Sequence, residues 1–286
     1  MARPPHRRDP PRVELPDDWP ACENEQINIQ LGDCELYCKV RGQGTPLLFV
    51  HGFPVSGAMW RLAVERLGDG WRCIVPDLRG HGQSSVSEQV TIPRFADDLA
   101  ELLDALDERT PAVIIGLSMG GIIAFEFYRR HRQRVRALVL CDTRANADTP
   151  EGAARREALA QKALREGSRA VADAMIDGVF APGAAPELKA HWHTVMAQTL
   201  PAGMAAAARA LAQRPESLST LPQIDCPTLV VVGADDTLTP VESMREIHRL
   251  IRGSRLEVIP GAGHLPPVEQ PDYFTRVLRS FLEEFA

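Results

Sequence analysis

The sequence predicts an α/β protein: a mostly parallel sheet flanked by helices, with an all-helical insertion. Three observations indicate this fold. Short apolar runs alternate with stretches of helical periodicity between residues 46 and 140, and again after residue 227. Turn-rich segments follow several of the apolar runs. Residues 143–221 are rich in alanine and contain no convincing strand, which predicts a helical cap over the carboxyl edge of the sheet.

The predicted elements follow in order from residue 24. Two antiparallel strands are expected at residues 25–30 and 34–41, and a strand at residues 46–50 begins the α/β alternation. The later elements with the clearest periodicity are helices at 155–166, 169–180 and 204–213 and strands at 227–233 and 255–260.

This order divides the chain into a tail, a core domain and a cap. Residues 1–23 mix arginine with proline and have no apolar run, which predicts a flexible tail and neither a signal peptide nor a membrane span. We expect the core domain to consist of residues 24–143 and 222–286. The cap, residues 144–221, is inserted after the sixth strand.

Composition narrows the classes of partner. A formal net charge of -6 argues against a nucleic-acid surface, and 44% hydrophobic residues suffice for a large core. The six cysteines lack zinc-ligand context, and Cys73 and Cys141 lie within apolar runs, so free thiols are expected. We therefore expect a cytoplasmic protein that uses no metal and no cofactor and has neither nucleic-acid nor membrane partners.

The most informative motif is Gly-Leu-Ser-Met-Gly at residues 116–120. It follows a β-branched run and leads into an apolar helical stretch, so the serine stands at a sharp strand-to-helix turn with its hydroxyl exposed. Glycines two residues before and after the serine let strand and helix pass closely. The pattern makes Ser118 the candidate nucleophile.

A serine nucleophile requires a histidine base and an acid that orients it. The loop after the strand at 255–260 contains His264, the candidate base. Asp235 and Asp236 follow the strand at 227–233, and Asp142 ends the apolar run at residues 139–141, so three carboxylates stand at the ends of neighbouring strands. Ser118, Asp236 and His264 occur in the order Ser, acid, His.

Five motifs in order make the chain similar to serine hydrolases of the α/β-hydrolase fold, in the branch of esterases and 3-oxoadipate enol-lactonases. The motifs are residues 51–54 (HGFP), 77–84 (DLRGHGQS), 116–121 (GLSMGG), 233–240 (GADDTLTP) and 261–267 (GAGHLPP). The resemblance covers residues 24–286. It implies Asp236, three residues after Gly233, as the acid, and leaves Asp235 as its solvated neighbour and Asp142 as the alternative.

We also predict an oxyanion hole, two structural histidines and one substrate-binding residue. The backbone N–H groups of Phe53 and Met119 are expected to form the oxyanion hole, since both lie next to the predicted turns at strand ends. His51 and His81 are interpreted as structural. In the cap, Trp192 is the candidate for substrate binding.

The sequence of the cap does not identify the substrate. His191 and His193 flank Trp192 and are weaker candidates for the pocket. The alanine-rich cap predicts a modest, mainly apolar pocket. Arginines at the start of the insertion could meet a substrate carboxylate; they are Arg144, Arg155 and Arg156.

The leading functional hypothesis is a hydrolase that cleaves small-molecule esters or lactones through an acyl-enzyme on Ser118. A C–C bond hydrolase and a cofactor-free perhydrolase use the same triad and remain alternatives, as does a non-catalytic ligand-binding protein on this scaffold. Monomer and homodimer both stay open.

Overall fold

The computed structural model describes residues 24–87 and 89–284 of the 286-residue chain, so the tail predicted at residues 1–23 lies outside the described residues. Its centre is an eight-stranded sheet in the order β1-β2-β4-β3-β5-β6-β7-β8. β2 pairs antiparallel with β1 and β4, and the other neighbours run parallel. The strands are β1 (Asn24–Leu31), β2 (Cys34–Arg41), β3 (Thr45–Val50), β4 (Trp71–Pro76), β5 (Ala112–Leu117), β6 (Val135–Cys141), β7 (Thr228–Gly233) and β8 (Arg255–Ile259).

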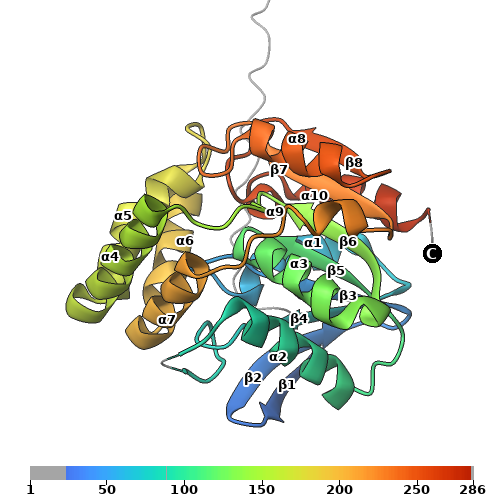
Figure 1. The fold of residues 1–286 in the computed structure, drawn as a ribbon, viewed down its shortest axis with the longest axis horizontal. Helices are drawn as coiled ribbons and strands as arrows, with labels where there is room; N and C mark the ends of the chain where they lie inside the picture. The colour runs from blue at the N-terminus through green and yellow to red at the C-terminus, as the bar shows by residue number, and fades with distance from the viewer. Residues whose placement is uncertain (1–23, 88, 285–286) are drawn as a thin grey trace, which may run out of the picture.

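Helices cover both faces of this sheet (Figure 1). Alternate residues of the central strands point to opposite faces, so Ile114 lies in one apolar cluster while Val113 and Ile115 lie in the other. The helices of the core domain are α1 (Arg61–Leu67), α2 (Ile92–Ala105), α3 (Met119–His131), α8 (Val241–Leu250), α9 (Pro266–Glu269) and α10 (Pro271–Leu282). Burial on both faces explains why the parallel strands are continuous apolar runs.

Four helices form the cap between β6 and β7, at one side of the sheet in Figure 1. They are α4 (Pro150–Glu166), α5 (Ser168–Val179), α6 (Pro186–Gln198) and α7 (Pro201–Ala212). α4 starts five residues earlier than its periodicity predicted. The Thr149 hydroxyl caps it by accepting a hydrogen bond from the N–H of Gly152, and Pro150 fits the first helical position.

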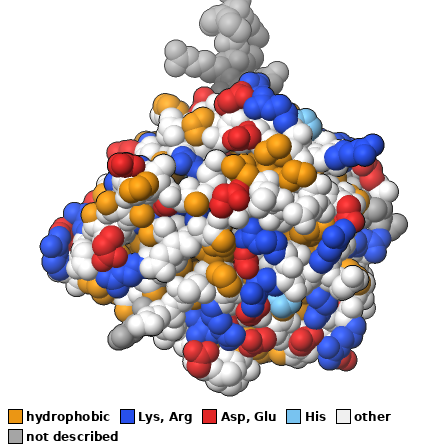
Figure 2. All heavy atoms as spheres, viewed as in Figure 1, with side chains coloured by type: hydrophobic (Ala, Val, Ile, Leu, Met, Phe, Trp, Pro, Cys, Tyr) orange, Lys and Arg blue, Asp and Glu red, His pale blue; other side chains and the backbone are white. Residues whose placement is uncertain are grey.

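The structure thus confirms the predicted fold class, an α/β sheet with a helical cap after the sixth strand. The five described cysteines are free thiols, as expected. Among the described helices, none has both the length and the apolar content needed to span a bilayer. Acidic and basic side chains are intermixed over the face of the molecule in Figure 2.

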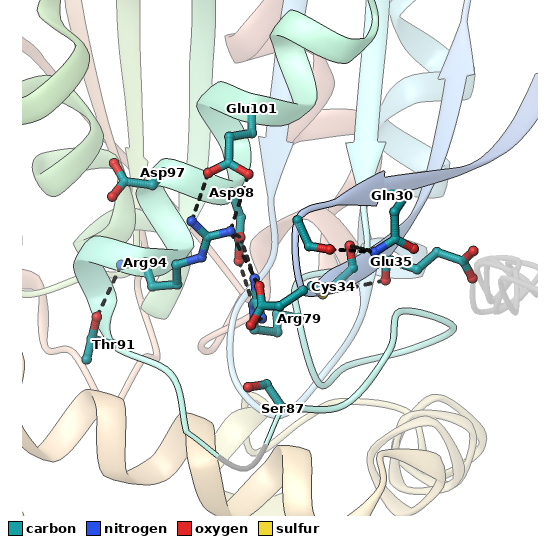
Figure 3. Close-up of polar contacts among 12 residues, drawn as sticks. Gln30, Cys34, Glu35, Arg79, Ser87, Thr91, Arg94, Asp97, Asp98 and Glu101 are labelled. Atoms are coloured by element: carbon teal, nitrogen blue, oxygen red, sulfur yellow. Dashed lines mark hydrogen bonds and ion pairs between the residues drawn. The ribbon is translucent and has the colours of Figure 1, made fainter.

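The loop after β4 is held by a buried ion-pair network (Figure 3). Arg79 donates to both carboxylate oxygens of Asp98 at 2.8 and 2.9 Å, and to Asp33 in the β1–β2 turn. Arg94 pairs with Asp98 and Glu101 on the same helix. Arg79 and Asp98 are both almost fully buried, and each has a second partner of opposite charge, Asp33 for Arg79 and Arg94 for Asp98, so the buried charges are compensated from two sides.

Candidate active site

Ser118 stands at the turn between β5 and α3, and its backbone is strained. Its φ of 55° and ψ of -111° lie outside the regions that non-glycine residues usually adopt. A Cβ on Gly116 would lie 2.3 Å from the carbonyl oxygen of Gly120, and one on Gly120 would lie 2.1 Å from that of Val50. The two glycines therefore permit the close crossing of strand and helix that this turn requires.

The turn is also fixed by hydrogen bonds to the neighbouring strand. The Ser118 N–H donates to the carbonyl of Cys141 at 2.8 Å, and the Thr143 hydroxyl donates to the Ser118 carbonyl at 2.7 Å. These contacts hold the backbone on either side of the hydroxyl. The side chain is half-buried and borders a cavity of about 430 Å³.

His264 lies in the loop between β8 and α9 and borders the same cavity. Its Nδ1 is 2.8 Å from Oδ2 of Asp236, and its backbone N–H donates to the carbonyl of Val179 at the end of α5. A histidine held at Nδ1 by a carboxylate presents Nε2 as the base. Nε2 is the ring nitrogen that the Asp236 contact leaves, and the side chain borders the same cavity as Ser118.

Asp236 is buried, and its charge is well solvated by hydrogen bonds. Oδ1 accepts from the N–H groups of Leu238 and Thr239 at 2.8 and 3.0 Å, and Oδ2 accepts from the Thr239 hydroxyl and from His264. Burial raises the pKa of Asp236, but the attraction of His264 and these hydrogen bonds outweigh it and hold the pKa below its usual range. Asp236 is therefore ionised beside His264.

The two other carboxylates considered for the acid occupy different places. Asp235 is exposed. Asp142 is fully buried, with Oδ1 accepting from the Gly233 N–H at 2.9 Å, and its φ is 45°. Burial, reinforced by the Asp236 charge, raises the pKa of Asp142 well above its usual value. The buried site next to the Asp236–His264 pair therefore favours the neutral form of Asp142.

The predicted oxyanion-hole residues flank the Ser118 turn. Phe53 borders the cavity, and Met119 is the first residue of α3. Within the described part of the chain, the N–H groups of both residues lack a hydrogen-bond partner. Two unpaired N–H groups beside the serine match the donors that an oxyanion requires.

His51 and His81 lie under this site and brace its loops. The Nε2 atom of His51 accepts from the Leu78 N–H at 2.9 Å, and the two imidazole centroids are 5.0 Å apart. Burial, with the neighbouring His81, holds the pKa of His51 well below its usual range, and burial lowers that of His81 to about 4. Both rings are neutral at physiological pH, in line with a structural role.

The cavity beside Ser118, called the Ser118 cavity below, is modest and lined mainly by apolar surface, as predicted, and charged side chains also stand in its wall. Its wall combines apolar side chains with four arginines. The lining residues are Phe53, Ser118, Ile122, Thr143, Arg144, Asp148, Gly152, Arg155, Arg156, Leu159, Met175, Leu211, Arg214, Thr237, Leu238, Thr239 and His264. Two of the four arginines, Arg155 and Arg156, are consecutive residues of α4 in the cap.

Trp192 does not line the Ser118 cavity, so its predicted role in substrate binding is not supported. It is fully buried in the apolar cluster on the α1 and α10 side of the sheet. In helix α6, Leu188, Trp192 and Met196 follow at intervals of four residues, so they lie on the same face of the helix. This face is buried, and the indole of Trp192 therefore points into the core. His193 pairs with Asp173 at the surface, and His191 packs edge-on against Trp192.

The structure adds Glu269, a residue that was not predicted. Oε1 accepts from the N–H groups of Gly263 and Leu265, at 2.9 and 3.2 Å on either side of His264, and Oε2 accepts from the Ala181 N–H at 2.7 Å. Burial raises the pKa of Glu269. Its side chain joins the His264 loop to the cap. In the sequence, the one feature that could have indicated Glu269 is that it is a single acidic residue directly after the apolar residues 265–268.

Asp142, Asp236 and His264 bring one potential metal-ligating atom each within 4.8 Å of one another, the one such group found among the described residues. The Nδ1 atom of His264 and Oδ2 of Asp236 are already joined by a hydrogen bond, and burial favours the neutral form of Asp142. A metal ion needs deprotonated ligands with free lone pairs, so the set fits a proton-transfer pair better than a metal site.

Residues 45–271 match the model of the alpha/beta hydrolase fold family. The chain belongs to this family. The α/β-hydrolase is 32% identical to a non-heme chloroperoxidase from Kitasatospora aureofaciens over 87% of this chain and 96% of the relative.

Two solved structures place this α/β-hydrolase among esterases and lactonases. A thermophilic esterase from Thermogutta terrifontis, solved with malate bound, has a TM-score of 0.87 and 41% identity, covering 92% of this chain and 99% of that one. The enol-lactonase from Burkholderia xenovorans LB400 has a TM-score of 0.84 and 28% identity, with 90% and 100% coverage. The motifs predicted a resemblance to esterases and enol-lactonases. These two structures confirm that resemblance.

Proposed function

We propose that this α/β-hydrolase cleaves carboxylic esters or lactones of small molecules through an acyl-enzyme on Ser118. The observation that carries the proposal is the hydrogen-bonded Asp236–His264 pair, which shares a cavity with a strained serine turn. The similarity to an esterase and an enol-lactonase supports it.

In the acylation step, Nε2 of His264 takes the Ser118 proton while Oγ attacks the ester carbonyl carbon. The N–H groups of Phe53 and Met119 stabilise the oxyanion of the tetrahedral intermediate. Collapse of this intermediate breaks the C–O bond, and His264 returns the proton to the leaving alkoxide. Asp236 stabilises the imidazolium during both transfers.

Deacylation repeats these steps with water. His264 takes a proton from water as its oxygen attacks the acyl carbon, and then gives the proton to Ser118 Oγ as the acyl–enzyme bond breaks. The products are a carboxylic acid and an alcohol, or one hydroxy acid from a lactone.

The test is covalent labelling with a fluorophosphonate probe, combined with hydrolysis of 4-nitrophenyl acetate. Ser118→Ala should abolish labelling and reduce kcat on the order of a millionfold, as loss of the nucleophile does in triad enzymes. Ser243→Ala, on α8 outside the Ser118 cavity, is the matched control. Turnover that persists in Ser118→Ala would exclude the mechanism.

The similarity to a chloroperoxidase favours perhydrolysis as a second candidate. Hydrogen peroxide would replace water in the deacylation step and release a peracid, which oxidises halide in solution. Bromination of monochlorodimedone in acetate buffer with peroxide and bromide measures this reaction. A rate that disappears in Ser118→Ala supports it, and the absence of bromination by the unmodified protein excludes it.

A further inference from the structure

The Ser118 cavity carries an excess of positive charge. Four arginines line its wall, from the segment after β6, from α4 and from the end of α7: Arg144, Arg155, Arg156 and Arg214. Asp148 is the one carboxylate among the residues that line the cavity. Guanidinium groups keep their charge in proteins, so this imbalance is present at every physiological pH.

Asp148 is shared by two of these arginines. Arg156 Nε lies 2.6 Å and Arg214 Nη1 2.7 Å from Oδ2 of Asp148. Arg214 is almost fully buried and also donates to the carbonyl of Asn146 at 2.8 Å. These two guanidinium groups therefore act as a structural clamp between the start of the cap and the end of α7.

The other two arginines, Arg144 and Arg155, border the cavity and form no ion pair with a carboxylate of the described residues, although Asp148 and Asp236 attract Arg144 and Glu151 attracts Arg155 at longer range. Arg144 donates to the carbonyl of Leu238, two residues after Asp236, and this neutral acceptor does not cancel its charge. Burial and the neighbouring Arg214 lower the pKa of Arg144. Arg155, on α4, forms no hydrogen bond or ion pair with any described residue.

We propose that Arg144 and Arg155 form a subsite for a carboxylate carried by the substrate, separate from the ester or lactone carbonyl that meets Ser118. A guanidinium binds a carboxylate through paired, charge-assisted hydrogen bonds, and an incoming anion compensates the excess charge of the wall. The volume of about 430 Å³ restricts the substrate to a small acid monoester or a lactone with an acidic substituent. This inference rests on the proposed hydrolase function and specifies its substrate class.

The experiment compares two methyl esters of equal chain length, monomethyl glutarate and methyl pentanoate. They differ only in that a carboxylate replaces the terminal methyl group, so the ratio of their kcat/KM values isolates the anionic group. Released methanol is measured at pH 7.5. We expect a ratio above ten for the unmodified enzyme, because a charge-assisted contact is worth about a factor of ten or more.

The variants Arg155→Gln and Arg144→Gln should each lower this ratio by about tenfold, since one charged contact is lost. The control is Arg165→Gln, which lies on the same helix with a side chain 70% exposed and outside the cavity wall. It should leave the ratio unchanged. A ratio near one in the unmodified enzyme, or a ratio that neither cavity variant lowers, would overturn the inference.

A binding measurement separates the subsite from catalysis. Calorimetric titration of Ser118→Ala with glutarate should show saturable binding, and the double variant with Arg155→Gln should bind at least about tenfold more weakly. Glutarate binding without ester turnover would retain the subsite and reject the hydrolase function. Turnover of both esters at equal rates without glutarate binding would retain the function and reject the subsite.

Discussion

At the scale of single residues, the pKa values of two neighbouring carboxylates, Asp236 and Asp142, are shifted in opposite directions, down for Asp236 and up for Asp142. Asp236 receives four hydrogen bonds and is ionised, whereas Asp142 is fully buried with one backbone donor, which favours its neutral form. Two adjacent buried carboxylates do not both ionise readily, so the hydrogen bonds decide which carries the charge. Only an ionised acid stabilises the imidazolium, which favours Asp236 over Asp142 for this role.

Asp236→Asn should therefore lower kcat by about four orders of magnitude, because an amide imposes the wrong tautomer on His264. Asp142→Asn replaces an acid that favours its neutral form by a neutral amide of the same shape and should cost far less. Asp235→Asn, at an exposed position, is the control. The measurement is kcat for 4-nitrophenyl acetate at pH 7.5. A loss in Asp142→Asn equal to that in Asp236→Asn would show that the acid is misassigned.

Glu269 permits a second prediction at this scale. In Glu269→Gln the amide oxygen can still accept from Gly263 and Leu265, but the NH₂ group then faces the N–H of Ala181. A buried N–H without an acceptor costs about 1–3 kcal/mol. We expect the free energy of unfolding in urea to fall by about 2 kcal/mol. Exposed Glu283→Gln should leave it unchanged, and an equal stability of both variants would contradict the role assigned to Glu269.

Ser118 and His264 could be predicted from the sequence, whereas Glu269 could not, and the difference has a physical reason. Ser118 and His264 lie in glycine-rich turns whose spacing is visible locally. Glu269 acts by accepting hydrogen bonds from backbone N–H groups, one of them 88 residues away at Ala181. Backbone donors carry no residue signature, so only the folded chain shows that Glu269 has partners.

At the scale of elements, the strands were predictable and the cap helices only in part. Strands buried on both faces give continuous apolar runs, and their predicted limits agree with the structure to within one or two residues. The helix α6 was missed. It buries only a narrow line of Leu188, Trp192 and Met196, and the polar residues between them obscured the helical period.

The loop at residues 77–84 gives a prediction for the pH dependence of stability. The pKa of His81 falls from 6.5 to about 4 on folding, because the ring is fully buried. The unfolded chain thus binds a proton that the folded chain does not, and the free energy of unfolding decreases as the pH falls from about 6.5 toward 4. A shift of this size corresponds to about 3 kcal/mol at the low-pH limit. His51 acts in the same direction.

Urea unfolding between pH 7 and pH 4 measures this dependence. The variant His81→Gln should have a shallower slope of free energy against pH, whatever its absolute stability. An unchanged slope in His81→Gln would show that this ring does not contribute to acid unfolding.

At the scale of the whole molecule, the sheet topology brings distant segments to one edge. β5, β6, β7 and β8 are parallel neighbours, so the residues after their carboxyl ends converge, and these include Ser118, Asp142, Asp236 and His264. The alternating pattern predicted this convergence from the sequence. The apolar lining and three of the arginines, Arg144, Arg155 and Arg156, were named from the sequence, whereas Arg214 was not, because it lies about 60 residues further along the chain, after α7.

The wall of the Ser118 cavity also determines which acyl chains fit. At about 430 Å³ the Ser118 cavity is near the lower end for ligand pockets, and Leu159, Met175 and Leu211 line its wall. We expect aryl esters of acetyl to hexanoyl length to be hydrolysed faster than long-chain triglycerides, without activation at a lipid interface. Each buried methylene adds about 0.8 kcal/mol of binding only until the cavity is full, so kcat/KM should rise with chain length and then fall.

Leu159→Ala should move this maximum to acyl chains longer by about one or two methylenes, because it removes apolar volume from the wall of the cavity. Leu164→Ala lies on the same helix, is 48% exposed and does not border the Ser118 cavity, so it should leave the maximum in place. Rates on 4-nitrophenyl esters from acetate to decanoate measure the shift. Both leucines belong to α4, so a loss of helix stability would affect the two variants alike. A shift of the maximum that occurs in Leu159→Ala alone would therefore come from the changed shape of the cavity. Faster hydrolysis of long-chain lipids than of short esters by the unmodified enzyme would mean that the cap opens as a lid and does not bound a small site.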